Sequence, residues 1–335
     1  MVRHEGATAA ESVTLPVTAI IVSYGSASVL PGCISALQEH LAPDQLLVID
    51  NASTDRSAVV ARERDAEVIV SQVNRGFGAG CNLGAKFARN DLLLFLNPDV
   101  YITSVDLIEL QKLSDRRPLG LIAPRYLLAP DSLHHEPGAR RSMPWPWHVA
   151  REALGPIVPR EISSRLRSRP VRPGRGSWLS GAVLLTSRAE FLEVGGFNER
   201  LFLYYEDQEL SGRYAEHGLP LSVTSGIRGR HARGGSSGAE PRLRRVSTGA
   251  SAMSSIEFVG INNGPLAGRC AWALYHGLRR CATIVVKLAS KGPVSARSAR
   301  KEHELRSTQS AAAKLLDAQT PHYPLVKTLA RGSHR

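Results

Sequence analysis

The chain has 335 residues, of which 43% are hydrophobic and 21% are charged, as in ordinary globular proteins and unlike disordered or fibrous ones. Its four cysteines form no Cys-x-x-Cys pair, which argues against a disulfide framework or a structural zinc site and favours a reducing compartment. We see no signal-peptide pattern and no apolar stretch close to the ~20 residues of a membrane span. We therefore expect a cytoplasmic protein that is soluble or peripheral to the inner face of the membrane.

The net charge of +12 is distributed unevenly along the chain. Residues 1–100 carry a net charge of −4, and residues 101–335 carry +16. A basic surface of this size predicts an acidic partner for the second part of the chain. Nucleic acid, anionic lipid and a phosphorylated substrate all satisfy that expectation.

Apolar runs alternate with helix-length segments over the first hundred residues. Runs rich in Val, Ile and Leu predict strands buried on both faces, at Val17–Ser23, Leu46–Asp50, Val68–Val70 and Leu92–Leu96. Between them we predict helices at 28–40, 55–64 and 79–89. This order predicts an α/β fold with a mostly parallel central sheet and helices on both faces. Ligands of such sheets bind at the carboxyl ends of the strands.

The remainder of the chain is less regular. Residues 129–175 read as a long basic loop region with one helix near 147–154. Further predicted elements are a buried strand at 177–186, helices at 187–194 and 206–217, a strand at 219–224, an amphipathic helix at 265–290 and a solvated helix or disordered tail from 291. We divide the chain into a disordered N-terminus (1–15), a first half (16–128), a second half (129–250) and a basic helical or disordered extension (251–335).

Polar residues follow each predicted strand of the first half. Asp99, in Asn97-Pro98-Asp99, comes after the most apolar run of the chain, so a rigid core would deliver its carboxylate to the ligand edge. Such a carboxylate suits Mg²⁺ or Mn²⁺, although a lone Asp after a strand is often only a turn residue. The glycine run 76–80 follows the third strand rather than the first, which favours a tight loop over a dinucleotide fingerprint.

A second acidic cluster begins a predicted helix at Glu206-Asp207. Carboxylates in a first helical turn commonly interact with the helix dipole. Here they follow an aromatic run, 201–205, that would desolvate them and give a general base a suitable pKa. Trp178 could supply an aromatic wall beside them. His231 lies in a later polar stretch and is either simply exposed or a ligand for a metal such as Mn²⁺.

These segments, in this order, resemble the inverting, nucleotide-sugar-dependent glycosyltransferases of family 2, which have the GT-A fold. The resemblance covers about 17–235 and rests on VTAIIVSYGS, VIDNASTD, NRGFGAGCNLG, LFLNPDV and WLSGAVLLTSRAEFLEVGGFNERLFLYYEDQEL, together with the later His231. Within the family, the similarity is greatest to the rhamnosyltransferase-like branch of bacterial cell-wall and surface polysaccharide synthesis.

The resemblance implies a role for each of these positions. The catalytic base would be Asp207, with Glu206 beside it, and Asp99 and His231 would hold the metal. A nucleotide-sugar donor would be bound by Ser23, Tyr24, Asp50, Asn51, Asn74, Arg75, Gly76 and Asn97, and an acceptor by Trp178, Ser180 and Gly181. Two positions depart from the family pattern: Gly25 stands where relatives usually have Asn, and Asn97 replaces the first Asp of D-x-D.

The activity implied by the resemblance is the transfer of a sugar, such as L-rhamnose from dTDP-rhamnose, to a polyprenyl-diphosphate-linked or polysaccharide acceptor. The acceptor diphosphate would then meet five basic residues, Arg140, Arg141, Arg165, Arg167 and Arg169, and segment 265–290 would lie on an anionic membrane surface. The alternatives are an inactive transferase-like scaffold and a basic membrane-binding or nucleic-acid-binding protein. We expect no nucleic acid, because the aromatic and basic residues are not interleaved.

Overall fold

The structure of the chain is a computed structural model. It describes residues 16–105, 109, 112–113, 115–128, 135–155, 158, 171–174, 176–232, 241–289 and 323–332. The predictions for the N-terminus (1–15), for Arg165, Arg167 and Arg169, and for most of the tail after 290 lie outside the described residues. None of the described helices is long and apolar enough to cross a membrane.

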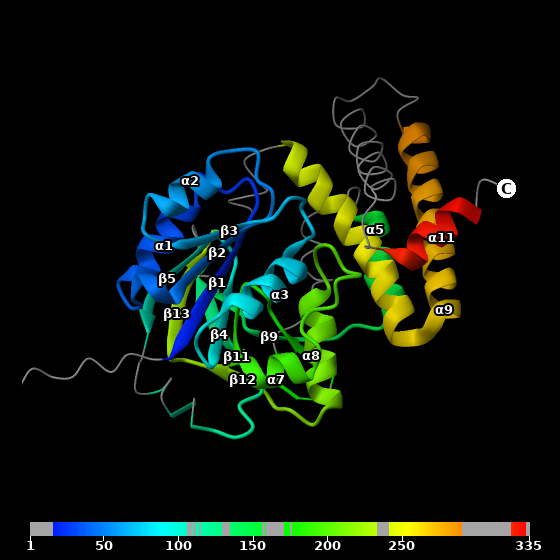
Figure 1. Cartoon of the computed structure of the whole chain (residues 1–335). Helices are drawn as coiled ribbons and strands as arrows, with labels where there is room; N and C mark the ends of the chain where they lie inside the picture. The colour runs from blue at the N-terminus through cyan, green and yellow to red at the C-terminus, as the bar shows by residue number, and fades with distance from the viewer. Residues whose placement is uncertain are drawn as a thin grey trace, which may run out of the picture.

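The core of the molecule is a seven-stranded sheet in the order β12-β6-β11-β4-β1-β2-β3 (Figure 1). Its strands are β1 (Val17–Ser23), β2 (Leu46–Asp50), β3 (Glu67–Val70), β4 (Leu92–Leu96), β6 (Leu121–Pro124), β11 (Val183–Ser187) and β12 (Leu221–Thr224). All neighbouring pairs are parallel except the two that involve β11, which runs antiparallel to both β4 and β6. The predicted mostly parallel α/β sheet is therefore confirmed.

Helices cover both faces of this sheet because successive residues of a strand point to opposite sides. From β1, Ile21 joins a core that includes α1 (Leu30–Gln38) and α2 (Ser57–Arg62), and Ile20 joins a core on the other face. The second face is covered by α3 (Phe77–Phe87), α7 (Arg188–Glu193) and α8 (Glu206–Glu216). A short 3₁₀ turn, η1 (Pro43–Gln45), leads into β2.

Two smaller sheets extend the carboxyl edge of the central one. The four-stranded sheet has the order β5-β13-β7-β8, and the two-stranded sheet pairs β9 with β10. These strands are β5 (Val100–Val105), β7 (Tyr126–Leu128), β8 (His135–Pro137), β9 (Ala139–Arg141), β10 (Ser177–Leu179) and β13 (Ile227–His231). The central and smaller sheets together draw on strands from both predicted halves of the chain.

Several local predictions need correction. The single strand expected at 177–186 is wrong: the chain leaves β10 at Ser180-Gly181 and continues as β11 in a different sheet. The strand near 68–70 is an edge strand whose residues are half-exposed or exposed, so it is not buried on both faces. The expected loop region 129–175 also contains the strands β8 and β9, whereas the helix predicted near 147–154 is confirmed as α5 (Trp145–Leu154). Tertiary pairing created the two strands from segments whose own patterns are weak.

A helical layer lies beside the sheet and consists of α5, α9 (Pro241–Ala289) and α11 (Pro324–Gly332) (Figure 1). Helix α9 is broken at Gly264, where φ is 86°, and Pro265 restarts it. Gly260 and Gly268 flank the break and approach closely, since a Cβ on Gly268 would lie 3.1 Å from the Gly260 Cα. The predicted helix at 265–290 is thus the second arm of a longer, folded-back helix.

Candidate active site

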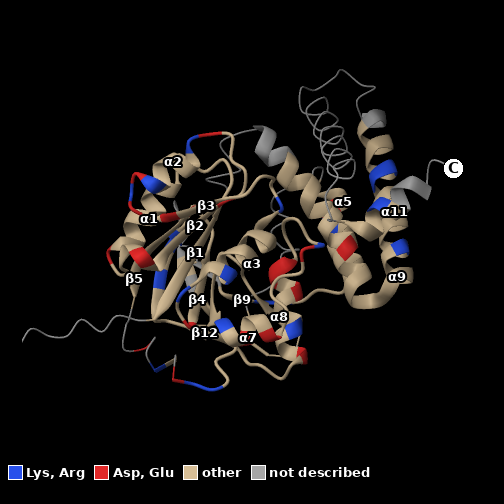
Figure 2. Cartoon of the chain, viewed as in Figure 1, with Lys and Arg blue, Asp and Glu red and all other residues tan. Residues whose placement is uncertain are grey.

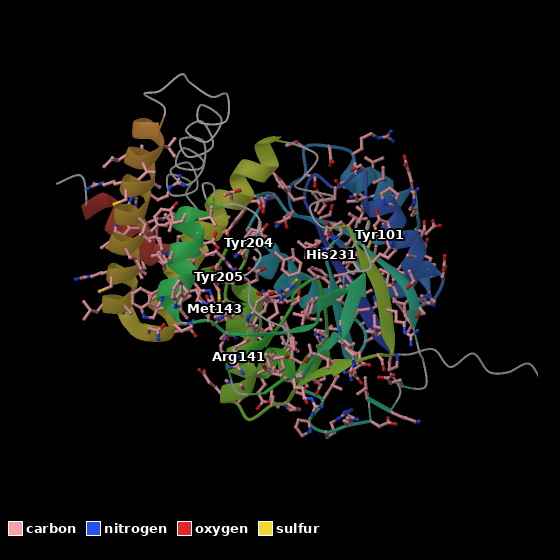
Figure 3. All side chains as sticks on the ribbon, turned by 180° about the vertical axis from the view of Figure 1, so that it is seen from behind. Tyr101, Arg141, Met143, Tyr204, Tyr205 and His231 are labelled. Atoms are coloured by element: carbon pink, nitrogen blue, oxygen red, sulfur yellow. The ribbon has the colours of Figure 1, made fainter. Side chains whose placement is uncertain are left out.

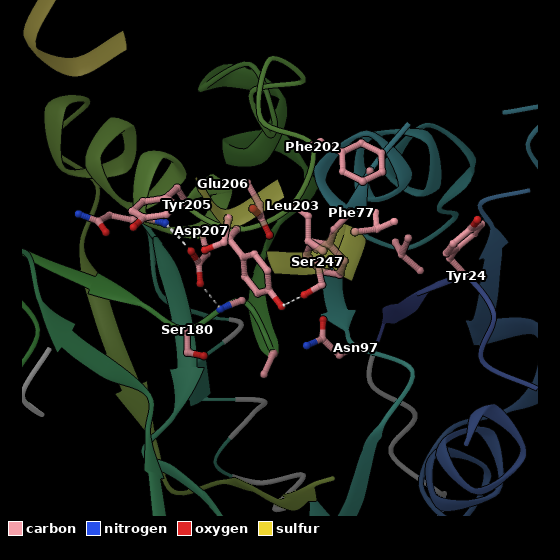
Figure 4. A pocket seen from close by; sticks show the side chains of 18 of the residues that line it. Tyr24, Phe77, Asn97, Ser180, Phe202, Leu203, Tyr205, Glu206, Asp207 and Ser247 are labelled. Carbon is pink, nitrogen blue, oxygen red and sulfur yellow. Dashed lines mark hydrogen bonds between the residues drawn. The ribbon is translucent and has the colours of Figure 1, made fainter. Parts of the chain in front are cut away.

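A cavity of about 760 Å³ opens where the carboxyl ends of the central strands face the helical layer (Figure 4). Most of the residues singled out from the sequence line it: Tyr24, Asn51, Asn74, Gly76, Asn97, Asp99, Trp178, Ser180, Gly181, Glu206, Asp207 and His231. The two that are farthest apart in the sequence, Tyr24 and His231, are separated by 207 positions. The fold therefore brings the two separate acidic clusters to one cavity.

Asp99 and His231 meet through the register of two strands. Val100 of β5 pairs with His231 of β13, and the backbone N–H of Ala232 donates to the Asp99 carbonyl at 2.9 Å. This pairing leaves His231 Nε2 3.3 Å from Asp99 Oδ1. The Asn97 amide nitrogen lies 3.5 Å from the same ring nitrogen. A carboxylate, an imidazole and an amide thus converge at one point of the wall.

This set of groups fits a divalent cation. Carboxylate oxygen and imidazole nitrogen suit Mn²⁺, and hard oxygen ligands suit Mg²⁺. Neighbouring ligands of an octahedral ion at about 2.1 Å lie about 3 Å apart, close to the 3.3 Å between Asp99 and His231. Within the described part of the chain, no group of three or more His, Cys, Asp or Glu side chains is placed to bind a metal. A cation held here would take its other ligands from phosphate oxygens and water.

The loop at 74–76 is held to the end of β2 by Asn51. The Asn51 side chain donates to the Gly76 carbonyl at 2.9 Å and accepts from the Arg75 N–H at 3.1 Å. Gly76 has φ of 86°, and a Cβ there would fall 2.0 Å from the Phe202 carbonyl oxygen. Only glycine tolerates that combination. Asn51 therefore holds this part of the cavity wall in place, and both its amide N–H and its amide oxygen are used in hydrogen bonds to the 74–76 loop.

Three of the predicted donor-binding residues do not line the cavity. Ser23 is fully buried in the sheet, and its hydroxyl has no partner among the described residues. Asp50 is buried as well; one of its carboxylate oxygens accepts from the Ser53 N–H at 3.1 Å, and the other has no partner in the described part of the chain. Arg75 instead turns outward to an ion pair with Glu199 at 2.5 Å. The structure gives Arg75 no contact with the cavity.

Asp207 is fixed at the start of α8 by backbone donors. Its Oδ2 accepts from the Gly181 N–H at 2.8 Å, and its Oδ1 accepts from the Gln208 N–H at 2.8 Å. The break between β10 and β11 places Gly181 there, and a Cβ on Gly181 would lie 3.1 Å from the Asp207 Cβ. Figure 4 shows Asp207 next to Glu206, with Ser180 below it and Asn97 across the cavity. The carboxylate is thus oriented toward the cavity by the backbone.

Burial perturbs both acids of this pair. Glu206 is 6% exposed, and its Oε2 has no hydrogen-bond partner among the described residues. Burial, and then the charge of Asp207, raise the pKa of Glu206 to about 8. Burial also raises the pKa of Asp207, while the N–H groups of Gly181 and Gln208, and then the charge of Arg140, act in the opposite direction. Asp207 is therefore the better candidate for the ionised member at neutral pH.

The residues before this pair have strained backbone. Tyr204 and Tyr205 have φ of 69° and 68°, which non-glycine residues rarely adopt. The Tyr204 hydroxyl forms a 2.6 Å hydrogen bond with Ser247 of α9. The Tyr205 hydroxyl lies 3.0 Å from Arg151 Nη2 and donates to Glu152 at 3.2 Å, both on α5. The two side chains thus tie the turn before Asp207 to the helical layer. Figure 3 shows Tyr204 and Tyr205 toward the helical layer and His231 toward Tyr101.

The helical wall of the cavity was missed by the sequence analysis. It includes His148, Arg151 and Glu152 from α5 and Ser247 and Ser251 from α9. His148 is 4% exposed, and burial, followed by the charge of Arg151, lowers its pKa to about 4. Neutral His148 packs edge-to-face on Tyr205, with the ring centroids 5.4 Å apart. No motif marks these residues, because they reach the cavity only through helix packing.

Trp178 and Arg140 form the remaining wall through the pairing of β9 with β10. The two residues are directly opposite in the register, and the Arg140 guanidinium carbon lies 6.0 Å from the Trp178 ring centroid. Burial raises the pKa of Asp207, and the charge of Arg140 acts against that rise. The aromatic wall predicted from Trp178 is therefore next to the candidate base. Arg141, by contrast, is exposed and does not line the cavity.

Comparison with known proteins defines the class of this domain. Residues 18–168 match the model of the family described as "Glycosyl transferase family 2". This segment contains β1 to β4 and Asp99, and Asp207 and His231 lie beyond it. Residues 18–168, which make up less than half of the chain, are therefore similar to glycosyl transferase family 2.

The names of the curated relatives specify an activity more closely than the family description does. The chain is similar to the N-acetylglucosaminyl-diphospho-decaprenol L-rhamnosyltransferase of Mycobacterium tuberculosis, with 31% identity over 198 residues that cover 54% of this chain and 64% of the relative. It is also similar to the low-salt glycan biosynthesis hexosyltransferase Agl10 of Haloferax volcanii, with 26% identity covering 58% of this chain and 60% of the relative. The chain thus spans less than two thirds of the length of these relatives. A solved mannosyltransferase from Pyrobaculum calidifontis superposes with a TM-score of 0.45 at 14% identity, covering 92% of this chain and 89% of that one.

Proposed function

We propose that the chain is an inverting glycosyltransferase that moves a sugar from a nucleoside-diphosphate donor to an acceptor hydroxyl. The observation that carries the proposal is the presence, in one cavity, of the Asp99–His231 pair and of Asp207 held by backbone N–H groups. Departure of a diphosphate requires charge neutralisation, and attack by a hydroxyl requires a base. The two clusters supply one group for each requirement.

The metal belongs at Asp99 and His231, with Asn97 beside them. A divalent cation bound there supplies charge neutralisation for the leaving diphosphate. The chain's own residues position it: Asp99 is 3% exposed at the start of β5, and His231 is fixed by its pairing with Val100. Mg²⁺ and Mn²⁺ both satisfy this set of ligands.

Asp207 takes the proton from the acceptor hydroxyl. Its carboxylate is oriented by Gly181 and Gln208, and protonated Glu206 beside it leaves one negative charge where two would repel. A single displacement with one base inverts the configuration at the sugar carbon. Tyr24, Asn74 and Asn97 line the donor side of the cavity, and Trp178, Ser180 and Gly181 line the acceptor side.

The donor and acceptor are proposed from the relatives. The name of the mycobacterial relative specifies L-rhamnose transfer to a diphospho-decaprenol-linked sugar. A dTDP-rhamnose donor and a polyprenyl-diphosphate-linked or polysaccharide acceptor are accordingly our first candidates, in bacterial cell-wall or surface polysaccharide synthesis. Arg140 and Arg151 line the acceptor side and are the cationic groups best placed to meet an acceptor diphosphate. Such an acceptor would place the protein in the cytoplasm, at the inner face of the membrane.

The test is a binding and turnover screen of the full chain with nucleotide sugars. Ligands that bind the folded state raise the melting temperature, so dTDP-rhamnose or a UDP-sugar with Mg²⁺ or Mn²⁺ should do so. The same donor should be hydrolysed slowly or transferred to a polyprenyl-diphosphate-linked acceptor. A chain that responds to NAD or RNA, and to no nucleotide sugar with metal, would contradict the proposal.

A further inference from the structure

The second arm of α9 has an exposed face with no described element packed against it. Leu266, Ile284 and Val285 are 74%, 56% and 60% exposed, and Cys270 and Cys281 are exposed on the same side. At helical spacing, these side chains form a stripe about 30 Å long that also contains Ala273, Gly277 and the two arginines Arg269 and Arg280. We call this surface the outer stripe.

The charge of the outer stripe has a single sign. Between Glu257 and Glu302 the sequence contains eight basic residues and no acidic one. Neighbouring arginines take opposite roles: Arg279 is 1% exposed and donates to the Ala153 carbonyl of α5, whereas Arg280 is exposed. Figure 2 shows the basic residues spaced along this arm. The helical layer thus buries Arg279 against α5 and leaves Arg269 and Arg280 exposed.

We propose that the outer stripe binds an anionic lipid surface, with the helix axis parallel to the membrane. Apolar side chains interleaved with arginines, without carboxylates, suit a helix at the boundary between headgroups and acyl chains. A second copy of the same face would be repelled, because Arg269 and Arg280 would meet like charges. Nucleic acid would satisfy the arginines but would leave Leu266, Ile284 and Val285 exposed to water.

The native cysteines make this surface directly testable. Cys33 and Cys81 are fully buried, so a polarity-sensitive maleimide dye should label only Cys270 and Cys281 on the folded protein. The Cys281→Ser variant places the dye at Cys270, and Cys270→Ser places it at Cys281. As a control, Val59→Cys on α2, in the background that lacks both exposed cysteines, puts the dye on a distant exposed site.

Each labelled protein is mixed with phosphatidylglycerol-rich vesicles or with pure phosphatidylcholine vesicles, at low and at high salt. We expect a blue shift and stronger emission at Cys270 and Cys281 with the anionic vesicles at low salt, and no change at Val59→Cys. An equal response to both vesicle types, or no response at either cysteine, overturns the proposal. A response of the same size at Val59→Cys also overturns it.

Unlabelled protein provides the second measurement, by co-sedimentation with the same vesicles. Each arginine near an anionic surface contributes about a fivefold factor in affinity, so Arg269→Glu with Arg280→Glu should weaken binding by about 25-fold or more. The matched control, Arg62→Glu with Arg116→Glu, changes the charge equally at exposed sites elsewhere and should bind like the parent.

If the control variant binds as weakly as the Arg269→Glu, Arg280→Glu variant (the stripe variant), net charge rather than this surface causes the binding. That result overturns the proposal. A parent dimer in light scattering that the stripe variant converts to monomers also overturns it, by assigning the surface to a second copy. The assays contain no sugar nucleotide. A failure here therefore leaves the proposed transferase activity untouched, and a failure of that activity leaves this surface untouched.

Discussion

The two ends of the cavity are built by different means. At the sheet end, backbone pairing fixes the functional groups, since Asp99 is adjacent to Val100, which is in register with His231. At the helical end, side chains from α5 and α9 meet the turn before α8, as Arg151 and Ser247 do with Tyr205 and Tyr204. Groups placed by sheet register are hard to move without unfolding the sheet, whereas groups placed by helix packing can be exchanged singly. We infer that the sheet end holds the proposed metal and that the helical end selects the acceptor.

The largest expected effect is at Asp207, the proposed base, which lies where the two ends of the cavity meet. Asp207→Asn keeps the size of the side chain but cannot take a proton, so turnover should fall by roughly 10²–10⁴ while donor binding is retained. Turnover and donor affinity are measured separately, by product formation and by calorimetry. The exposed Asp65→Asn serves as the control. Near-normal turnover in Asp207→Asn would refute the assignment and direct attention to Glu206.

The sheet end is tested next through His231. Removing this imidazole in His231→Ala should weaken metal-supported donor binding by at least about tenfold, because metal sites respond on this scale even to changes around their ligands. Donor binding without added metal should be unchanged. His217→Ala, at the exposed end of α8, is the matched control. Equal loss of binding with and without metal would place His231 in the fold rather than at the cation.

Glu206 gives a prediction about stability and pH. Its raised pKa means that the folded state keeps a proton that the unfolded state releases above its ordinary value near 4.5. The folded state is therefore favoured at low pH, and stability should fall as the pH rises from about 4.5 to about 8. Glu206→Gln removes that proton exchange, so its melting temperature should fall less over the same range. Parallel curves for Glu206→Gln and for the exposed Glu63→Gln would contradict the raised pKa.

The smallest effect is expected at the helical end. Tyr204→Phe removes the hydrogen bond to Ser247, and such a bond contributes about 0.5–1.5 kcal/mol. If this contact shapes the acceptor wall, the KM for the acceptor should rise by about two- to tenfold with the KM for the donor unchanged. Ser247→Ala should do the same, and the double variant should add little. Changes of equal size in both KM values would show that the two ends of the cavity are not separable.

The sheet end could be predicted from the sequence because its signals are local. The apolar runs before Asp50 and Asp99 are strands in the structure, and polar residues after parallel strands reach one edge. The same rule also predicted that Ser23 and Arg75 would reach the ligand edge, and neither lines the cavity. A position at the end of a strand does not specify whether the side chain enters the cavity. Ser23 is buried in the sheet, and Arg75 pairs with Glu199 on the outside.

The helical end could not be predicted, because its groups come together through packing between distant segments. Nothing near His148 signals that α5 will face Tyr205, and Ser247 lies in a stretch of ordinary polar composition. The break at Gly181 was hidden inside an apolar run that reads as one strand. Its reason is visible only in three dimensions, where the Gly181 N–H meets the Asp207 carboxylate.

The fold-back of α9 at Gly264 has a consequence for how the molecule can vary. The first arm carries Ser247 and Ser251 into the cavity, and the second arm carries the outer stripe, so the turn between them connects the cavity wall to the surface that we propose binds lipid. The exposed Asn262 and Asn263 precede this turn. Residues inserted at exposed turns are well tolerated, so lengthening this one would change the reach from the outer stripe to the cavity without altering a single cavity residue. Under the two proposals made above, the length of this turn sets how far the cavity lies from the lipid surface.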